Sequence, residues 1–352
     1  MDLSPALRIL RDPVLVMPVL LLAAGCDTAG PEGFPPPEPV TLDTEGLRPL
    51  PDFEDNPLTR QGIDLGRRLF HDPILSGDRS QSCASCHDQA HAFSDPRRFS
   101  VGIDGTEGER NAPPLFNLAW SPSFFWAGRA ASLEDQAREP VPNPIEMNLP
   151  WEEAVARLAA HPEYPERFGR AFGTIEIDPD RVVRAIAQFE RTLLSRDSRY
   201  DRHLRGEISL TEAESRGEVL FFGETVGCFR CHGTILFTDH EFHDNGLDLV
   251  PVDPGRQAVT GEESDRGKFR SPALRNVEYT APYMHDGRFV TLEEVMDHYS
   301  SGVQPSPNLD PILAGAGPPG LPLTDADEAD LVAFLKTLSD PGFLANPDFG
   351  PL

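Results

Sequence analysis

The five-residue pattern Cys-x-x-Cys-His occurs twice in this sequence, at residues 83–87 and again at residues 228–232. On one helical turn the two cysteines and the histidine share a face, so two thiols can bond to a haem while the imidazole reaches its iron. A haem covers more surface than any side chain, and it would help to organise a small helical domain. The pattern predicts two covalently attached haem c groups, held by Cys83, Cys86 and the iron ligand His87, and by Cys228, Cys231 and the iron ligand His232.

Two other uses of these cysteines are less favoured. Zinc ribbons place their cysteine pairs roughly 15–20 residues apart, whereas Cys86 and Cys228 lie far apart in the sequence. A thioredoxin-like Cys-x-x-Cys would need a βαβ context and would not require a histidine after both pairs. The two motifs use four of the five cysteines and leave no pair for a disulfide, which supports haem attachment.

Composition limits the fold and the partners. The 36 prolines and 29 glycines predict long loops between modest helices, and no long alternating strand pattern appears. We therefore expect a mainly α fold with two c-type cytochrome domains, each around one covalently attached haem. The formal net charge of −26 argues against a nucleic-acid partner, because phosphates are met by basic patches. A well-solvated surface explains the acidity best, and steering towards a cationic partner is the alternative.

The first 25 residues are typical of an export signal. The apolar run Val14–Ala24 is too short for a membrane-spanning helix, which needs roughly 20 residues. Small residues precede Cys26, which predicts lipidation there and a mature N-terminus at that cysteine. An ordinary cleaved signal or a start site assigned too early is the alternative, because Arg8 and Arg11 are offset by nearby acids. The prediction is a periplasmic protein that meets the membrane only through an N-terminal lipid.

Similar segments precede the two motifs, Gly-Arg-Arg-Leu-Phe at 66–70 and Gly-Glu-Val-Leu-Phe at 217–221. This faint repeat predicts two related haem domains. The expected organisation is a lipoprotein signal at 1–25, a Pro/Gly-rich tether at 26–50, an N-terminal haem domain at 51–197, a C-terminal haem domain at 198–345 and a tail at 346–352. Capping signals predict helix starts at Asp178-Pro179, at Thr211 with Glu214, at Thr291 with Glu294, and at Thr324 with Asp327.

A string of ordered motifs between about Pro51 and Asp340 resembles the bacterial di-haem cytochrome c peroxidases and the related MauG-type enzymes. Within that family the chain is most similar to the MauG-like, MbnH-type di-haem enzymes. The motifs that carry the resemblance include Arg-Asn-Ala-Pro at 110–113, Phe-Trp-Ala-Gly-Arg-Ala at 125–130, Phe-Arg-Ser-Pro-Ala-Leu-Arg-Asn-Val at 269–277 and Thr-Ala-Pro-Tyr-Met-His-Asp-Gly at 280–287.

The resemblance implies roles for residues of the first haem site. His87 would be the proximal ligand of the peroxide-reacting haem, with Gln136 and Glu146 on its distal side. A carboxylate there makes chemical sense, because splitting the O–O bond needs a proton moved from one oxygen to the other. Trp126 matches a tryptophan between the two haems and would relay electrons; a buried core aromatic is the plainer explanation, and it could be both.

One departure from the family pattern predicts an open iron site. Peroxidases that need reductive activation carry a histidine directly after a Val/Ile-Gly step beyond the first haem motif. Here Ile103 follows that step at residues 101–102, and isoleucine cannot bind iron. We expect a five-coordinate first haem, with His91 as the main rival ligand although its spacing differs.

The second ligand of the second haem is predicted to be Tyr299. The resemblance places that ligand fourteen residues after His285, where ordinary peroxidases have methionine and MauG-type enzymes have tyrosine. Tyr299 also shares a helical face with Met296, one turn earlier, which is the alternative ligand. Phenolate oxygen is hard and anionic and favours oxidised iron, whereas thioether sulfur raises the potential.

The family also implies one Ca²⁺ between the domains, bound by Asn111 and the carbonyls of Thr280 and Pro282. These features predict a peroxide-dependent di-haem oxidoreductase that oxidises Trp or Tyr residues of a periplasmic partner protein. A peroxidase that takes electrons from a small cytochrome or cupredoxin is the first alternative. A non-enzymatic electron carrier is the second, and the distal residues Gln136 and Glu146 argue against it.

Overall fold

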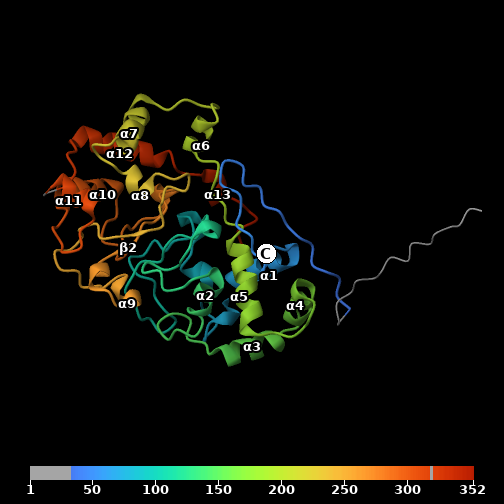
Figure 1. Ribbon diagram of the computed structural model, residues 1–352. Helices are drawn as coiled ribbons and strands as arrows, with labels where there is room; N and C mark the ends of the chain where they lie inside the picture. Colours follow the sequence, from blue (N-terminus) through green and yellow to red (C-terminus); the bar gives the residue numbers. More distant parts are fainter. Residues whose placement is uncertain (1–32, 318–319) are drawn as a thin grey trace, which may run out of the picture.

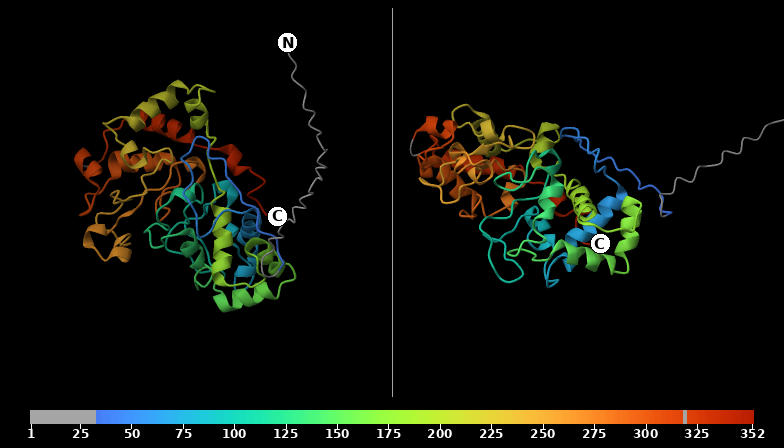
Figure 2. Two further views of the ribbon diagram at one scale, coloured as in Figure 1. Left: turned by 45° about the vertical axis from the view of Figure 1, so that its right-hand side comes forward. Right: turned by 60° about the horizontal axis from the view of Figure 1, so that its bottom comes forward.

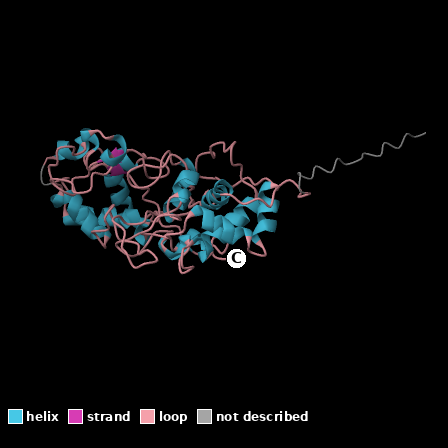
Figure 3. Ribbon diagram, turned by 90° about the horizontal axis from the view of Figure 1, so that it is seen from below, coloured by secondary structure: helices cyan, strands magenta, loops and turns pink. Residues whose placement is uncertain are grey.

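The computed structural model describes residues 33–317 and 320–352 and is mainly helical, with long loops between short helices (Figure 3). The predicted fold class is therefore correct as to its helical character. The signal segment and Cys26 lie outside the described residues. The first part of the chain contains α1 (Arg60–His71), η1 (Pro73–Leu75), η2 (Cys83–Ser85), η3 (Gln89–His91), η4 (Leu118–Trp120), α2 (Leu133–Arg138), α3 (Trp151–Ala159), α4 (Tyr164–Phe172) and α5 (Pro179–Glu190).

The second part lies beside the first as a separate cluster of helices, at the upper left of Figure 1. Among the described residues no helix is long and apolar enough to cross a membrane. The strands β1 (Phe242–His243) and β2 (Phe269–Arg270) form one short antiparallel pair. The helices are α6 (Arg199–Leu204), α7 (Glu212–Phe222), α8 (Phe229–His232), α9 (Gln257–Thr260), η5 (Glu263–Asp265), η6 (Val277–Tyr279), α10 (Leu292–Asp297), the π-helical turn η7 (His298–Gly302), α11 (Pro311–Ala316), α12 (Asp325–Lys336) and α13 (Pro341–Leu344).

The predicted helix starts are confirmed. Asp178 caps α5 by accepting a hydrogen bond from the backbone N–H of Arg181, and proline occupies the first helical turn. Reciprocal capping boxes begin the three other helices. Each threonine side chain accepts a hydrogen bond from the backbone N–H three residues on, and the carboxylate of that residue accepts one from the backbone N–H of the threonine. These boxes join Thr211 and Glu214 at α7, Thr291 and Glu294 at α10, and Thr324 and Asp327 at α12.

The faint repeat before each haem motif corresponds to one packing arrangement used twice. Helix α1 packs on α5, and α7 packs on α12 in the same manner (Figure 1). Each crossing is close because a glycine faces the partner backbone: a Cβ on Gly66 would lie 1.9 Å from the carbonyl oxygen of Ala185, and one on Gly217 would lie 2.0 Å from that of Asp330. The two pairs lie in separate hydrophobic cores, which supports two related halves.

A second repeated unit follows, which we call the loop–helix unit, at residues 124–138 and again at residues 283–297. Each begins with a residue that forms an antiparallel β-bridge across a tight loop, Phe124 with Ala130 in the first unit and Tyr283 with Phe289 in the second. Each loop passes through two left-handed residues, at 125 and 128 in the first and at 284 and 287 in the second. Each then enters a helix capped by Ser132 or Thr291, so α2 and α10 are equivalent.

The two halves meet through matching backbone bonds of these units. The N–H of Asn111 donates to the carbonyl of His285 at 2.8 Å, and the N–H of Arg270 donates to the carbonyl of Trp126 at 2.9 Å. Trp126 and His285 occupy the same position of the two loop–helix units. The interface between the halves is therefore formed by two similar surfaces that face each other.

The C-terminal residues return to the first half, next to α1 (Figures 1 and 2). Phe343 and Phe349 belong to the N-terminal core, and Arg67 donates hydrogen bonds to the carbonyls of Pro347 and Gly350 at 2.6 Å. Residues from 33 to 50, in the predicted tether, also follow this half, with Pro39 bridging to Thr59. The predicted domain limits stay a prediction.

Candidate functional site: two cavities beside the cysteine motifs

The first motif lies on the wall of a cavity of about 340 Å³. The backbone N–H of His87 donates to the carbonyl of Cys83 at 3.0 Å, so the motif forms one helical turn as predicted. The Nδ1 atom of His87 lies 2.8 Å from the carbonyl oxygen of Phe93. That oxygen can only accept, so Nδ1 carries the proton and Nε2 keeps its lone pair for a metal. Burial lowers the pKa of His87, which keeps the ring neutral.

Both predicted distal residues line this cavity. Gln136 lies on α2, and Glu146 lies in the loop before α3. Glu146 accepts a hydrogen bond from the Asn143 amide at 2.7 Å. Burial raises the pKa of Glu146, and this effect exceeds the opposing ones of Asn143 and Arg129. A carboxyl group whose pKa is moved towards neutrality is suited to take up and release a proton.

The rival ligand for the first iron is not at this cavity. His91 is bonded to Asp88, with Nδ1 2.8 Å from the carboxylate oxygen, and it is not among the residues that line the cavity. Ile103 follows Val101 and Gly102, which do line it. His87 is thus the sole histidine among the described residues that line this cavity, and the open face of the first iron stays a prediction.

The second motif lines a more apolar cavity of about 220 Å³ and repeats the first in detail. The Nδ1 atom of His232 lies 3.0 Å from the carbonyl oxygen of Phe237, which again leaves Nε2 free. Phe93 and Phe237 both have left-handed backbones, at φ values of 59° and 55°. Residues other than glycine rarely adopt this backbone conformation. In both halves it turns the phenylalanine carbonyl towards the histidine.

Two methionines and a tyrosine line the second cavity together with His232, as does His285. Tyr299 and Met296 are the two predicted alternatives, and Met284 is a third that sequence reasoning missed. The Nδ2 atom of Asn245 lies 3.4 Å from both the Tyr299 hydroxyl oxygen and the Met284 sulfur. Burial raises the pKa of Tyr299 to about 12 in the haem-free chain.

Tyr299 differs in its local structure from what the pattern predicts. Helix α10 ends at Asp297, and Tyr299 lies in the π-helical turn η7 that follows. The wider turn changes the direction of its side chain relative to the α-helical stripe that begins with Leu292. Single π turns of this kind are frequent at functional sites, and no sequence signal predicted this one.

Trp126 lines both cavities, and its role as a relay between two haems stays a prediction. Its indole N–H donates to the carbonyl of Asn111 at 2.8 Å. Asn111, Thr280 and Pro282 also line one cavity in common, so the predicted calcium ligands are near one another. Calcium itself stays a prediction.

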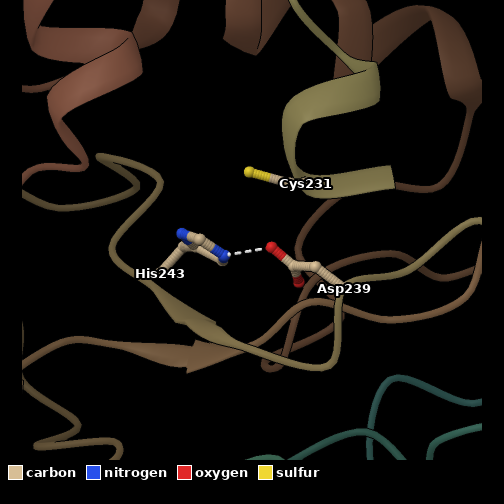
Figure 4. A group of neighbouring side chains, drawn as sticks. All are labelled: Cys231, Asp239 and His243. Carbon is tan, nitrogen blue, oxygen red and sulfur yellow. Dashed lines mark hydrogen bonds and ion pairs between the residues drawn. The ribbon is translucent and has the colours of Figure 1, made fainter. Parts of the chain in front are cut away.

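A group of ligand-type side chains lies beside the second motif. Figure 4 shows His243 and Asp239 joined by an ion pair, with Cys231 of helix α8 next to them. The Nε2 atom of His243 lies 2.9 Å from the Asp239 carboxylate oxygen. The other ring nitrogen of His243 lies 2.7 Å from Asp310. Two carboxylates can accept hydrogen bonds from the two ring nitrogens only if both nitrogens are protonated. The pKa of His243 is accordingly raised to about 11, with the hydrogen bond to Asp239 as the largest cause. A protonated imidazole cannot bind a metal, so this is an ion-pair cluster.

Two buried polar side chains at the first cavity were also missed. Glu190 ends α5 with one carboxyl oxygen unpartnered, and burial raises its pKa to about 8. Arg270 is buried with its Nε unpartnered and lines both cavities. Their sequence contexts, Phe-Glu-Arg and Phe-Arg-Ser, contain no signal of burial.

The paired thiols, the free Nε2 atoms and the two apolar-walled cavities fit two covalently bound haems, one per motif. The family model for di-haem cytochrome c peroxidases matches residues 60–209. The methylamine utilization protein MauG of Methylorubrum extorquens is 40% identical over 85% of this chain and 84% of its own. The cytochrome c peroxidase Ccp of Escherichia coli K12 is 37% identical over 84% of this chain and 61% of its own.

A crystal structure of a MauG-like protein associated with microbial copper homeostasis matches with a TM-score of 0.82 and 38% identity, over 88% of this chain and 97% of that one. The chain belongs to the family of di-haem cytochrome c peroxidases and MauG proteins. It is a peroxide-dependent oxidoreductase, and its family implies two c-type haems.

Proposed function

We propose that this enzyme reduces hydrogen peroxide at the first haem and takes the electrons from Trp or Tyr residues of a partner protein, with Tyr299 as a ligand of the second haem. The observation that carries the proposal is the position of Tyr299, which is partly buried and lines the second cavity together with His232. Burial raises the pKa of its hydroxyl, and the hydrogen bond from Asn245 opposes this effect and favours the phenolate that would bind iron.

Haem iron would supply the site at which the peroxide O–O bond is broken. Glu146 would take a proton from one peroxide oxygen and return it to the other, and the raised pKa of this carboxyl supports both steps. Gln136 would orient the bound peroxide from α2. Each peroxide takes up two electrons and two protons and yields two water molecules. Trp126 would carry the electrons between the cavities, because its side chain lines both.

The partner protein would be periplasmic, and the enzyme would be tied to a membrane through a lipid on Cys26. Calcium at Asn111, Thr280 and Pro282 would join the two halves. Asn111 supports this role, because its side-chain amide already donates to the carbonyl of Arg97 at 2.9 Å and its backbone bonds to the other half.

A second candidate function is a peroxidase that receives electrons from a small cytochrome or cupredoxin. Met296 and Met284 favour it, since both residues line the second cavity and thioether ligation raises the potential of a haem that accepts electrons.

The test adds stoichiometric peroxide to the oxidised protein after a pyridine haemochrome assay has established two haems per chain. We expect a long-lived oxidised state that aromatic donors quench slowly. Tyr299→Met should abolish this state and raise the potential of the second haem, whereas the matched variant Met296→Leu should leave both unchanged. The opposite pattern would identify Met296 as the ligand, and fast turnover only with a reduced donor protein would support the peroxidase.

A further inference from the structure

Arg270 is a buried cation without an anion. Its Nε atom is buried while the side chain borders two cavities, and burial lowers the pKa of Arg270 to about 10 with no opposing attraction from any acid. One terminal nitrogen, Nη1, donates to the hydroxyl of Ser121 and to the carbonyl of Ser123, the latter at 2.9 Å. The Nε atom has no hydrogen-bond partner. Burying an unpaired charge is among the most costly features a fold can contain.

The other deeply buried arginine of the second half shows how the fold normally handles such a charge. Arg275 has a fully buried side chain and makes two bonds to the Asp201 carboxylate, at 2.7 and 2.8 Å. Arg129, at the rim of the first cavity, is 39% exposed and bonds to Glu139 at 2.7 Å. Arg270 therefore differs from these two, because no acidic side chain of the described residues forms an ion pair with it.

The surroundings of Arg270 indicate where the missing anion lies. Arg270 lines the first cavity, the second cavity and a small cavity of about 40 Å³ that also touches Trp126 and His240. His240 has a buried, unpartnered Nε2, and burial together with the charge of Arg270 lowers its pKa to about 4. A neutral His240 supplies no negative charge, so the anion must come from what fills the large cavities.

We propose that Arg270 binds the propionate groups of both haems and is their shared counter-charge. The propionates are the anionic groups that a haem carries, and a guanidinium binds carboxylates in a well-defined planar geometry. With Nη1 used by Ser121 and Ser123, three N–H donors remain on Nε and Nη2, enough for two carboxylates. The proposal rests on the two haems that the family implies, and it is independent of the partner protein and of Tyr299.

The test measures the midpoint potentials of the two haems by spectroelectrochemical titration of the haem-loaded protein. A cation beside a propionate stabilises the more negative, reduced haem, so Arg270→Gln should lower both potentials. We expect at least a tenfold change in the one-electron equilibrium of each haem, which is about 59 mV. Arg270→Lys keeps the charge and should stay near the wild-type values. Arg129→Gln removes the same charge from an exposed, already paired site and should shift them much less.

The proposal is overturned if Arg270→Gln and Arg129→Gln shift the potentials equally. A shift at one haem alone would overturn the shared role and assign the guanidinium to that haem. If Arg270→Gln does not accumulate with two haems, the wild-type crystal structure decides. A propionate oxygen of each haem within hydrogen-bond distance of the Arg270 guanidinium supports the proposal, and a solvent anion or water there instead overturns it. Neither result depends on activity with a partner protein.

Discussion

The two loop–helix units differ at the residue that follows their helix. Helix α2 ends at Arg138, and the position equivalent to Tyr299 is Pro140, which lines the first cavity. Helix α10 instead continues into the π-helical turn that carries Tyr299. Proline has no side-chain donor atom and cannot continue a helix. At this position of the unit the first cavity therefore has no donor atom, whereas the second cavity has Tyr299, the ligand that we propose.

The same comparison explains how the halves divide the chemistry. Both hold their histidine by the same bond to the carbonyl of a left-handed phenylalanine, Phe93 or Phe237. The proximal side is therefore common to the two sites, and the distal side differs. In the function that we propose, Glu146 in the first wall serves the reaction with peroxide, and Tyr299 in the second serves to store an oxidising equivalent.

The largest expected effect comes from removing the acid that is found only in the first half. Glu146→Gln should slow the reaction with peroxide by about 10²- to 10⁴-fold, the usual range for a general acid–base group. Stopped-flow mixing of the oxidised protein with peroxide measures this rate.

The wild-type rate should also fall as the pH drops through the pKa of Glu146, because the carboxylate form accepts the proton. This fall lies at a pH above the ordinary 4.5, since burial raises that pKa. The variant should lose the pH dependence. A variant that retains the wild-type rate would remove the main chemical difference between the two cavities.

The next effect concerns stability, and it is specific to the second half. Arg275 is paired with Asp201, whereas the equivalent residue of the first half is the buried Phe116. Arg275→Met leaves a buried carboxylate without its partner and should lower the free energy of unfolding by about 3–5 kcal/mol. Guanidinium denaturation followed by circular dichroism measures the change, with Arg170→Gln as a control expected to change it little, because Arg170 and its partner Glu166 are both exposed.

The stability that this pair provides should depend on pH. Burial alone would raise the pKa of Asp201, but the hydrogen bonds and charge of Arg275 outweigh burial and lower it. The contribution is therefore present above the unfolded-state pKa of Asp201 and is lost as the pH falls through its lowered folded-state pKa. An unchanged pH dependence in Arg275→Met would contradict this account of the pair.

The smallest effect tests whether the halves are truly equivalent. Gly66→Ala and Gly217→Ala should each cost about 1–3 kcal/mol of stability, because the added methyl meets a backbone carbonyl of the facing helix. Gly315→Ala in α11 has open space and should cost nothing. Thermal denaturation compares the three variants. A large cost at one of the two crossings alone would break the correspondence between α1–α5 and α7–α12.

Local signals predicted the parts of this molecule that depend on neighbours in sequence. The caps at Asp178, Thr211 and Thr291 are set within one helical turn, and both haem motifs are single turns. The resemblance, rather than any local pattern, predicted that Gln136 and Glu146 lie at the same site, and both line one cavity.

What sequence reasoning missed depends on contacts between distant segments. The π-helical turn at Tyr299 follows from the packing of the chain around it, and Leu321 donates its backbone N–H to the Tyr299 carbonyl at 2.7 Å. Arg270 has no helix or motif position that marks it as buried, because the walls around it come from both halves. The repeated loop–helix unit was also missed, because its two copies share their turns but few of their residues.

The return of Phe343 and Phe349 to the first hydrophobic core affects the order in which the polypeptide matures. Translation delivers these phenylalanines after the whole second haem segment has left the ribosome. The N-terminal core thus stays unfinished while its own cysteines are already available for ligation. Attachment of the first porphyrin must work on a partly assembled scaffold, or wait until the last aromatic rings close it.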